Sequence, residues 1–456
     1  MEATMNREQL QKNFKRISDN VFSLADGYDA EVSLDFTDSA LTRFANNIIH
    51  QNVAVSNGGI SIRLLKGRKE GKVSINLFSD DKAIAKAIQK AREIVEHSTD
   101  NEEILPILDV QKYREIDRFH PKTADLTPDD RADLVSNVVS SCEKENFTAA
   151  GIVENSATAI GIANSKGLFA YWDGTGFNFS LTVEGKSGTG WSESISWSVD
   201  RTNPQSDIEE AIEIARKSQN PKDIEAGKYT VILTPAAVAD LISFLSIYGF
   251  NARMHLEGRS FLTGKLGQKV FSDKLTIIDD AYDENWAGIP FDFEGVPRQK
   301  VELIKNGVLT NLVVDRWTGE KMNLTPTGHG LPQPNQWGAI PMNIVIEPGD
   351  TTMDDMVKSV KNGLLVTHFH YTNVSEFTKL TITGMTRDGL FAIKNGEIAY
   401  PVKNLRFTQS TLDTFNNIIA IGKKRRVMAG FFFGGAYAPA ILVDNFNFSS
   451  ATEFGG

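Results

Sequence analysis

The sequence predicts an α+β protein with an N-terminal antiparallel sheet plus helices and a C-terminal β-rich domain that is curved or barrel-like. Three observations indicate this fold class. Two stretches of the first half alternate apolar and polar residues, and each is followed by an amphipathic helix. The second half repeats Asn-Gly hairpin signals between apolar runs. The 456 residues exceed one typical domain, and we expect domains over residues 1–224 and 225–456.

The first module of the N-terminal domain, over about residues 1–100, is expected to begin with a helix. Apolar side chains between Leu10 and Leu24 recur every three or four positions, which is typical of an amphipathic helix. Residues 51–79 alternate around glycine-rich turns and predict strands. The apolar residues of 81–97 again share one helical face. Strands that end in a helix are therefore the expected plan of this module.

A second module, over about residues 120–224, repeats that plan. Thr127-Pro128-Asp129-Asp130 opens a helix with a hydroxyl N-cap, a proline in the first turn and acidic residues near the N-terminus. Cys142, the only cysteine, follows on the apolar face of this helix, and we expect a buried core thiol rather than a nucleophile. Strands are expected over about 148–200 and a helix over about 207–218.

The C-terminal domain begins after a polar stretch at 221–227. An apolar strand is expected at 229–233, and Thr234-Pro235 then starts a helix with an apolar face. Asn306-Gly307 and Asn395-Gly396 each lie between apolar runs, as a type I′ hairpin turn requires. The domain is therefore expected to be mostly β, in a closed or strongly curved sheet.

One apolar run, residues 427–443, could be a membrane span or buried β structure. A span needs about 20 apolar residues, whereas this run is shorter and contains several glycines and Pro439. Buried strands joined by a glycine turn are favoured. Consecutive phenylalanines at 431–433 must point to opposite faces of a strand, so one face needs a covering element. We predict a two-fold dimer through this region; the alternative is cover by the helix after Pro235.

The overall charge and the cysteine content exclude several classes of protein. Lys plus Arg is 48 against Asp plus Glu 58, a net charge of −10 that opposes direct binding to nucleic acid or to an anionic membrane. A single cysteine excludes an intrachain disulfide and a four-thiolate metal site. Residues 1–24 lack the apolar core and cleavage site of a signal peptide. Together these features predict a cytoplasmic protein.

Among the seven histidines, only His368 and His370 form a local pair. In the strand expected at 364–371 they fall on one face, because strand side chains repeat every second residue. They could hold a metal ion with a third ligand from elsewhere, and the candidate donors are His255, Glu257 and His329. The alternative is a metal-free, hydrogen-bonded pair on a polar sheet face.

Several sequence blocks in order along nearly the whole chain resemble the PmbA/TldD family, whose members are often called modulators of DNA gyrase. The blocks are LEGRSF at 256–261, GKLGQKV at 264–270, TIIDD at 276–280, PFDFEGVP at 290–297, TGMTRDG at 383–389, GEIAYPVKNLRF at 396–407 and the segment 43–51. The resemblance implies a cytoplasmic protein with the α+β and β-rich regions described above. It also implies a dimer that, in its two-chain form, encloses a peptide-cleaving chamber.

The catalytic branch of that family carries His-Glu-x-x-x-His on a helix, where two histidines and a later cysteine bind zinc and the glutamate activates water. Counted back from Gly264, these positions fall at 243–248 and read Ser-Phe-Leu-Ser-Ile-Tyr. The chain contains no His-Glu dipeptide, and Cys142 lies in the other half. The sequence thus resembles the PmbA/TldE branch, which lacks the metal motif.

The resemblance implies a subunit of a peptidase assembly that is not catalytic alone, without a cofactor of its own. Zinc is expected in a TldD-like catalytic partner chain, and the substrate is expected to be an extended or unfolded peptide. The chain would form a homodimer or a heterodimer with that partner. Two alternatives stay open: a metallopeptidase with a rebuilt histidine site, and a protein-binding modulator of DNA gyrase. Whether the chain alone is an enzyme therefore stays open at this point.

Overall fold

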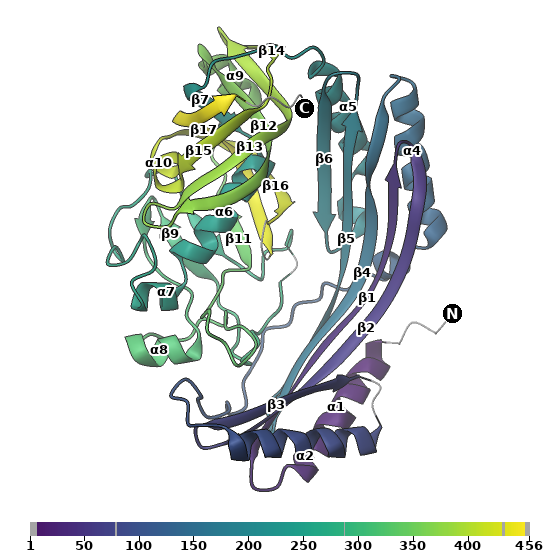
Figure 1. Ribbon diagram of the computed structural model, residues 1–456, viewed down its shortest axis with the longest axis vertical. Coiled ribbons are helices and arrows are strands. Elements are labelled where there is room, and N and C mark those ends of the chain that lie inside the picture. Colours follow the sequence, from purple (N-terminus) through teal and green to yellow (C-terminus); the bar gives the residue numbers. More distant parts are fainter. Residues whose placement is uncertain (1–6, 78–79, 287, 431–433, 452–456) are drawn as a thin grey trace.

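The computed structural model describes residues 7–77, 80–286, 288–430 and 434–451. Figure 1 shows a long, twisted antiparallel sheet that runs beside a β-rich C-terminal region. The predicted α+β fold class is confirmed. Among the described helices, none combines the length and the apolar composition that crossing a bilayer would require.

Six antiparallel strands form the N-terminal sheet in the order β3-β2-β1-β4-β5-β6. They are β1 (Asp29–Ala45), β2 (Ile48–Lys66), β3 (Lys69–Asn76), β4 (Thr148–Asn164), β5 (Phe169–Glu184) and β6 (Thr189–Ser196). Each set of three strands is contiguous in sequence, and the two sets join where β1 pairs with β4. The sequence did not single out β1, although it lies at the centre of the sheet. Strand β6 forms the edge nearest the C-terminal region (Figure 1).

Helices cover one end and one face of this sheet. They are α1 (Arg7–Leu24), α2 (Asp81–His97), α3 (Pro121–Ala124), α4 (Pro128–Glu143), a 3-10 turn η1 (Val199–Arg201) and α5 (Pro204–Lys217). Helices α1 and α2 share an apolar core with β1 and β2, whereas α4 and α5 share another with β4 and β5. The predicted cap is confirmed, since Thr127 and Asp130 form a reciprocal capping box. Cys142 is fully buried, and burial raises the pKa of its thiol to about 11.

Eleven strands form the C-terminal sheet. They are β7 (Gly227–Leu233), β8 (Ile277–Asp279), β9 (Val301–Lys305), β10 (Val308–Leu309), β11 (Asn343–Ile346), β12 (Asn362–Glu376), β13 (Thr381–Lys394), β14 (Glu397–Pro401), β15 (Leu405–Ser410), β16 (Ile418–Ala429) and β17 (Gly435–Ala451). Strands β17, β15, β13, β12 and β7 follow one another in the sheet, and β7 pairs again with β17. The sequence predicted a curved or barrel-like sheet, and this second pairing closes the five strands into a barrel.

Helix α6 is the main helix of the C-terminal core. The helices here are α6 (Pro235–Gly249), α7 (Ala252–Leu256), α8 (Arg316–Met322), α9 (Met353–Ser359) and α10 (Thr411–Asn416). Most side chains of α6 are buried, and they pack with residues of β7, β12 and β17. Asp240 is its only charged residue. A helix that is apolar on nearly every side is expected only in an interior, so its single carboxyl is conspicuous.

The predicted hairpin turns are confirmed. Asn306 and Gly307 have φ of 46° and 78°, and Asn395 and Gly396 have φ of 52° and 84°, so both turns place two residues in the left-handed region. The apolar run forms the antiparallel pair β16–β17, and Gly430 N–H donates to the Gly434 carbonyl at 3.1 Å. Buried β structure is therefore confirmed for the described part of this run. Residues 431–433 lie outside the described residues, so the dimer through them stays a prediction.

Candidate functional site

A small acidic pocket lies where the edge strand β6 meets the barrel. Its volume is about 170 Å³, and its lining residues come from β6, α6, β12 and the β16 hairpin: Trp191, Glu193, Ala236, Asp240, His368, Met428, Ala429 and Gly430. We call these residues the acidic pocket. A larger groove of about 730 Å³ shares Trp191, Ala236 and Met428 with it. The acidic pocket is therefore a side chamber of a groove between the two domains.

The local structure of each element explains why these side chains meet. Trp191 and Glu193 are two positions apart on β6, so they project from the same face of that strand. Asp240 comes from the second turn of α6, which packs against β12 and β17. His368 lies on β12, next to β13 in the barrel. Elements distant in sequence therefore contribute every ionisable group of the pocket.

His368 is held by a carboxylate and by an aromatic ring. Its Nδ1 lies 3.3 Å from Asp388 Oδ2, and its ring stacks on Trp191 with centroids 4.3 Å apart and planes at 7°. Burial alone would lower the pKa of His368, but Asp388 and the charge of Asp240 outweigh it and raise the pKa. Stacking of an imidazolium on an indole also favours the charged ring. His368 is thus expected to carry a proton more readily than a free histidine.

The two carboxyls that line the pocket hold their protons to a higher pH than a solvated carboxyl does. Burial raises the pKa of Asp240 to about 7, and burial also raises the pKa of Glu193. Glu193 Oε2 accepts a hydrogen bond from the Ala429 N–H at 3.2 Å. Asp240 Oδ2 is buried and has no hydrogen-bond partner among the residues that the structure describes. Buried polar atoms are nearly always hydrogen-bonded, so a buried oxygen without a donor is unusual and calls for an explanation.

Ion pairs from Arg426 hold the two domains together beside the pocket. This β16 side chain lies 2.9 Å from Asp207 and 2.6 Å from Glu210, both on α5. It also donates to the Glu193 carbonyl at 2.8 Å. Arg426 therefore ties β16 to β6 at the residue whose side chain enters the pocket.

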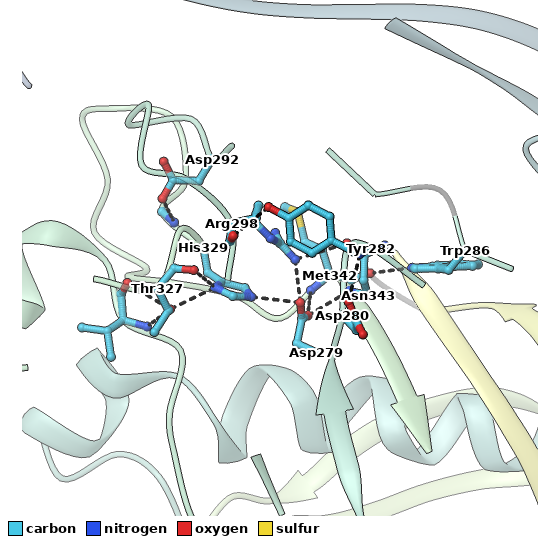
Figure 2. Close-up of polar contacts among 12 residues, drawn as sticks. Asp279, Asp280, Tyr282, Trp286, Asp292, Arg298, Thr327, His329, Met342 and Asn343 are labelled. Carbon is cyan, nitrogen blue, oxygen red and sulfur yellow. Dashed lines mark hydrogen bonds and ion pairs between the residues drawn. The ribbon is translucent and has the colours of Figure 1, made fainter. Parts of the chain in front are cut away.

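His329, a candidate ligand in the sequence, is part of a separate buried cluster (Figure 2). Its Nε2 lies 2.9 Å from Asp279 Oδ1, and its Nδ1 lies 2.9 Å from the Thr327 carbonyl. Arg298 Nη2 also contacts Asp279 Oδ1, at 2.6 Å. We call Asp279, Arg298 and His329 the Asp279 cluster. Both ring nitrogens of His329 are engaged within it, so this histidine does not reach the acidic pocket.

The other three candidates also have partners of their own. His255 Nε2 is hydrogen-bonded to the Gly249 carbonyl at 2.7 Å, and Glu257 pairs with Arg253 at 2.8 Å. His370 lies edge-on to Tyr371 with centroids 5.3 Å apart. Burial lowers the pKa of His255, and it also lowers that of His370. Of the five candidate residues, the structure places only His368 in the acidic pocket.

Sequence reasoning missed most residues of the site. Asp388 stood inside the block at 383–389 without an assigned role, and Asp240 was a lone charge in an apolar helix. Those two signals could have indicated the site.

A second pair of buried carboxyls, Asp292 and Glu294, was also missed by sequence reasoning. Burial raises their pKa values to about 6 and about 8. Asp292 accepts a hydrogen bond from the Gly330 N–H at 2.7 Å (Figure 2).

The positions that align with the family's zinc motif do not offer a zinc donor set. Ser243, at the first histidine position, donates to the carbonyl four residues earlier at 2.8 Å, and Phe244 stands at the glutamate position. Tyr248, at the second histidine position, lies edge-on to Phe377 with centroids 5.2 Å apart. Within the described residues, no group of three or more His, Cys, Asp or Glu is arranged to hold a metal ion. Hydroxyl and aromatic groups are poor substitutes for imidazole and thiolate at zinc, so these residues do not fit the ion.

Comparisons with known proteins identify the family. Models of the PmbA/TldA metallopeptidase family match in chain order: domain 1 over 30–95, the central domain over 121–219 and the C-terminal domain over 226–450. The chain is 30% identical over 224 residues to a metalloprotease of Methanothermobacter thermautotrophicus, a match that covers 49% of this chain and 48% of that protein. The match therefore spans about half of that relative.

Two further proteins match over most of their length. Metalloprotease PmbA of Escherichia coli O157:H7 is 25% identical over 92% of each chain. The crystal structure of TldE from Thermococcus kodakarensis superposes with a TM-score of 0.86 at 19% identity, covering 95% of this chain and 99% of that one. The ordered domain matches, together with the shared fold, show that this chain belongs to the PmbA/TldD family.

Proposed function

We propose that this chain is a PmbA/TldE-like subunit of a PmbA/TldD-type peptidase assembly and that it does not cleave peptides alone. A TldD-like partner would supply the zinc ion and the glutamate that activates water. The proposal retains a cytoplasmic location and an extended or unfolded peptide as substrate. What the chain itself would supply is a wall that binds and orients that peptide.

One observation carries the proposal. Within a chain whose domains match the family in order, residues 243–248 hold no zinc ligand, and the two serines there bond within α6. The family's catalytic branch holds its zinc ion with two histidines and a cysteine and keeps one metal position open. The family scaffold without its donor set supports a role in assembly and substrate binding.

The groove between the domains supports a peptide-binding role. Its walls include the apolar side chains of Ile214, Leu365 and Phe391 beside charged residues of α5 and β16. At about 730 Å³ it lies within the size range of ligand sites. The edge strand β6 borders it, and strand edges can pair with extended peptides.

The test compares the chain alone, a TldD-like subunit that carries His-Glu-x-x-x-His alone, and the two together. Each sample receives an unfolded protein substrate, and products are followed by mass spectrometry. We expect cleavage that requires both chains and is abolished by a chelator. A partner whose motif glutamate is replaced by glutamine serves as the matched control. Robust metal-dependent cleavage by the present chain alone would falsify the proposal.

The predicted dimer has its own test. Sedimentation equilibrium of the chain alone at micromolar concentration should give twice the monomer mass of 50.3 kDa. The apolar β16–β17 region is the expected interface. A clean monomer over the whole concentration range would refute the homodimer, and a complex only with the TldD-like subunit would leave the heterodimer.

A metallopeptidase with a rebuilt histidine site has one observation in its favour, because His368 shares a pocket with Glu193 and Asp240. The ring nitrogens of His255 and His329 are bonded elsewhere, which weighs against it. Elemental analysis of untagged protein after dialysis distinguishes a rebuilt metallopeptidase from a non-catalytic subunit, since a three-ligand site should retain zinc. Stoichiometric zinc would favour the rebuilt site over the non-catalytic subunit.

A modulator that binds DNA gyrase is the third candidate. The basic run 423–426 would favour contact with DNA, whereas the net charge of −10 opposes it. Arg426 pairs with two acidic residues, and Arg425 lies over the Tyr437 ring at 4.1 Å. We expect no mobility shift of duplex DNA at low ionic strength, where electrostatic binding is strongest. A protein–protein contact with gyrase would leave that result unchanged.

A further inference from the structure

The acidic pocket has more negative than positive groups. Glu193 and Asp240 line it, and Asp388 lies directly behind His368. The nearby cations are His368, which pairs with Asp388, and Arg426, which pairs with Asp207 and Glu210. His368 interacts with Asp240 through its charge but is hydrogen-bonded to Asp388, and no ion pair within contact distance involves Asp240 among the described residues. A ligand that carries positive charge would complete the electrostatics of this pocket.

The hydrogen bonding of the pocket is also incomplete. Asp240 receives a hydrogen bond from the Phe369 backbone, but its Oδ2 has no donor among the described residues. Glu193 is 8% exposed, and one backbone N–H donates to its Oε2. Each carboxylate can accept several hydrogen bonds. When Asp240 is ionised, the missing partner is therefore a donor, which a chloride ion or an ionised carboxylate cannot be.

The walls favour an organic cation over a bare metal ion. The indole of Trp191 lines the pocket beside Ala236 and Met428, so part of the lining is apolar and aromatic. Aromatic faces attract ammonium groups. In contrast, the described residues include no three-ligand arrangement for a metal ion. A primary ammonium has three donors on a compact charge and an apolar stem behind it.

The pocket opens beside the groove in which the proposed function places a peptide. Trp191, Ala236 and Met428 line both spaces, so a ligand in the groove can extend one end past these side chains. We propose that the acidic pocket binds a primary ammonium group at the end of a groove ligand, either the N-terminal amine of a peptide or a lysine side chain. The inference rests on the proposed function only in taking a peptide as the carrier of that ammonium.

The experiment measures binding to the full chain alone by isothermal titration calorimetry at pH 7. The probes are the tripeptide Ala-Leu-Ala amide with a free N-terminus, its N-acetylated form, N-acetyl-Ala-Leu-Lys amide, and n-butylamine. We expect the free-amine tripeptide or the lysine probe to bind about 10-fold or more tightly than the acetylated tripeptide, because a charge-assisted hydrogen bond is lost on acetylation. The two amine probes tell the N-terminal source from the lysine source. Binding of n-butylamine reports the ammonium site without a peptide.

Variants test whether the pocket is responsible. Glu193→Gln and Asp240→Asn should each reduce the affinity for the amine probes about 10-fold or more. Glu209→Gln is the matched control, because Glu209 is an exposed residue of α5 that lines neither the groove nor the pocket, and it should leave the affinity unchanged. Two pocket variants are used so that the test remains possible if one of them does not fold, and circular dichroism checks the folding of each.

Equal affinity for the free and acetylated probes together with no n-butylamine binding would overturn the inference. So would retention of amine binding in both folded pocket variants. Because the assay uses the chain alone and involves no cleavage, its failure is distinct from a failure of the peptidase assembly. Amine binding without cleavage by the mixed subunits would support the pocket and contradict the proposed function.

Discussion

The Asp279 cluster, inside the C-terminal domain, and the acidic pocket, between the two domains, each contain an aspartate and a histidine, but the two aspartates differ in their hydrogen-bond partners. Asp279 Oδ1 contacts Arg298 and His329, and its Oδ2 accepts from the N–H groups of Met342 and Asn343 at 2.7 and 2.9 Å. Asp240 Oδ2 has no donor among the described residues. Burial tends to raise both pKa values, but around Asp279 the charges of Arg298 and His329 outweigh it and hold the pKa well below its usual range.

The comparison shows that the pKa of a buried carboxyl depends on the hydrogen-bond donors and charges around it, and not on its burial alone. Asp279 ends the short strand β8, where the backbone of the neighbouring strand supplies N–H groups. Asp240 lies inside α6, whose backbone N–H groups are used within the helix. A helix therefore offers its own side chain no donors, and a carboxyl there depends on other elements or on a ligand.

The largest expected effect is the loss of the Asp279 cluster. Asp279→Ala leaves Arg298, which is almost completely buried, without its partner. We expect the free energy of unfolding at pH 7 to fall by about 3–5 kcal/mol, measured by urea denaturation. Because the folded pKa of Asp279 is depressed, its contribution is present above the pKa of the unfolded chain and is lost on acidification.

The control for that variant is an ion pair next to the cluster in which the basic partner is exposed. Lys300 lies 3.0 Å from Asp280, and its side chain is 60% exposed. Lys300→Met should change the free energy of unfolding by about 0.5 kcal/mol or less. If both variants lowered the free energy of unfolding equally, the buried ion pair of Asp279 would contribute no more than the pair of the exposed Lys300, and the comparison would be wrong.

A smaller effect of opposite sign is expected in the acidic pocket. The folded pKa of Asp240 is raised to about 7, so the folded state holds its proton longer and stability falls as pH rises from about 4 to 7. Asp240→Asn removes this loss and should raise the free energy of unfolding at pH 8 by about 2–4 kcal/mol. Near pH 4 the variant and the parent should agree within about 0.5 kcal/mol. Urea denaturation at both pH values checks this, and destabilisation at pH 8 would contradict it.

The smallest effect is expected from the ion pairs that join the domains beside the pocket. Arg426 is partly exposed, so Arg426→Met should lower the free energy of unfolding by about 1 kcal/mol. Hydrogen exchange of β6 should rise more than that of β4, because Arg426 contacts the edge strand. Lys424→Met, a neighbouring exposed residue of β16, is the matched control and should leave β6 unchanged. Equal exchange in both variants would show that Arg426 does not hold this edge.

Short-range patterns predicted the elements well. The capping box at Thr127, the helices after it and after Pro235, and the Asn-Gly turns depend on residues within a few positions of one another. The helix at 81–97 begins and ends where the apolar pattern does. A closed or strongly curved C-terminal sheet was also predicted, although no pattern in the sequence indicated which strands close it.

The candidate site was predicted poorly because its residues meet only through tertiary contacts. Alternation along a strand placed His368 and His370 on one face, and β12 pairs with β13 without a register shift from His368 to His370. The two rings nevertheless have different partners, Trp191 for one and Tyr371 for the other, because those partners are set by how β6 packs against β12 and by the local backbone. No local pattern brings Glu193 of β6 against β16, since the contact depends on how the domains pack.

The pairing of strand β17 has a consequence for how the chain folds during its synthesis. It pairs with β7, β11, β15 and β16, so residues near 442 close a barrel that begins near residue 232. A ribosome must therefore release nearly the whole C-terminal domain before its barrel can close, whereas the hairpins of the N-terminal sheet are complete much earlier. Until then β7 has an unpaired edge and α6 an uncovered apolar surface. Unpaired strand edges and exposed apolar surface of this kind make a folding chain prone to aggregation.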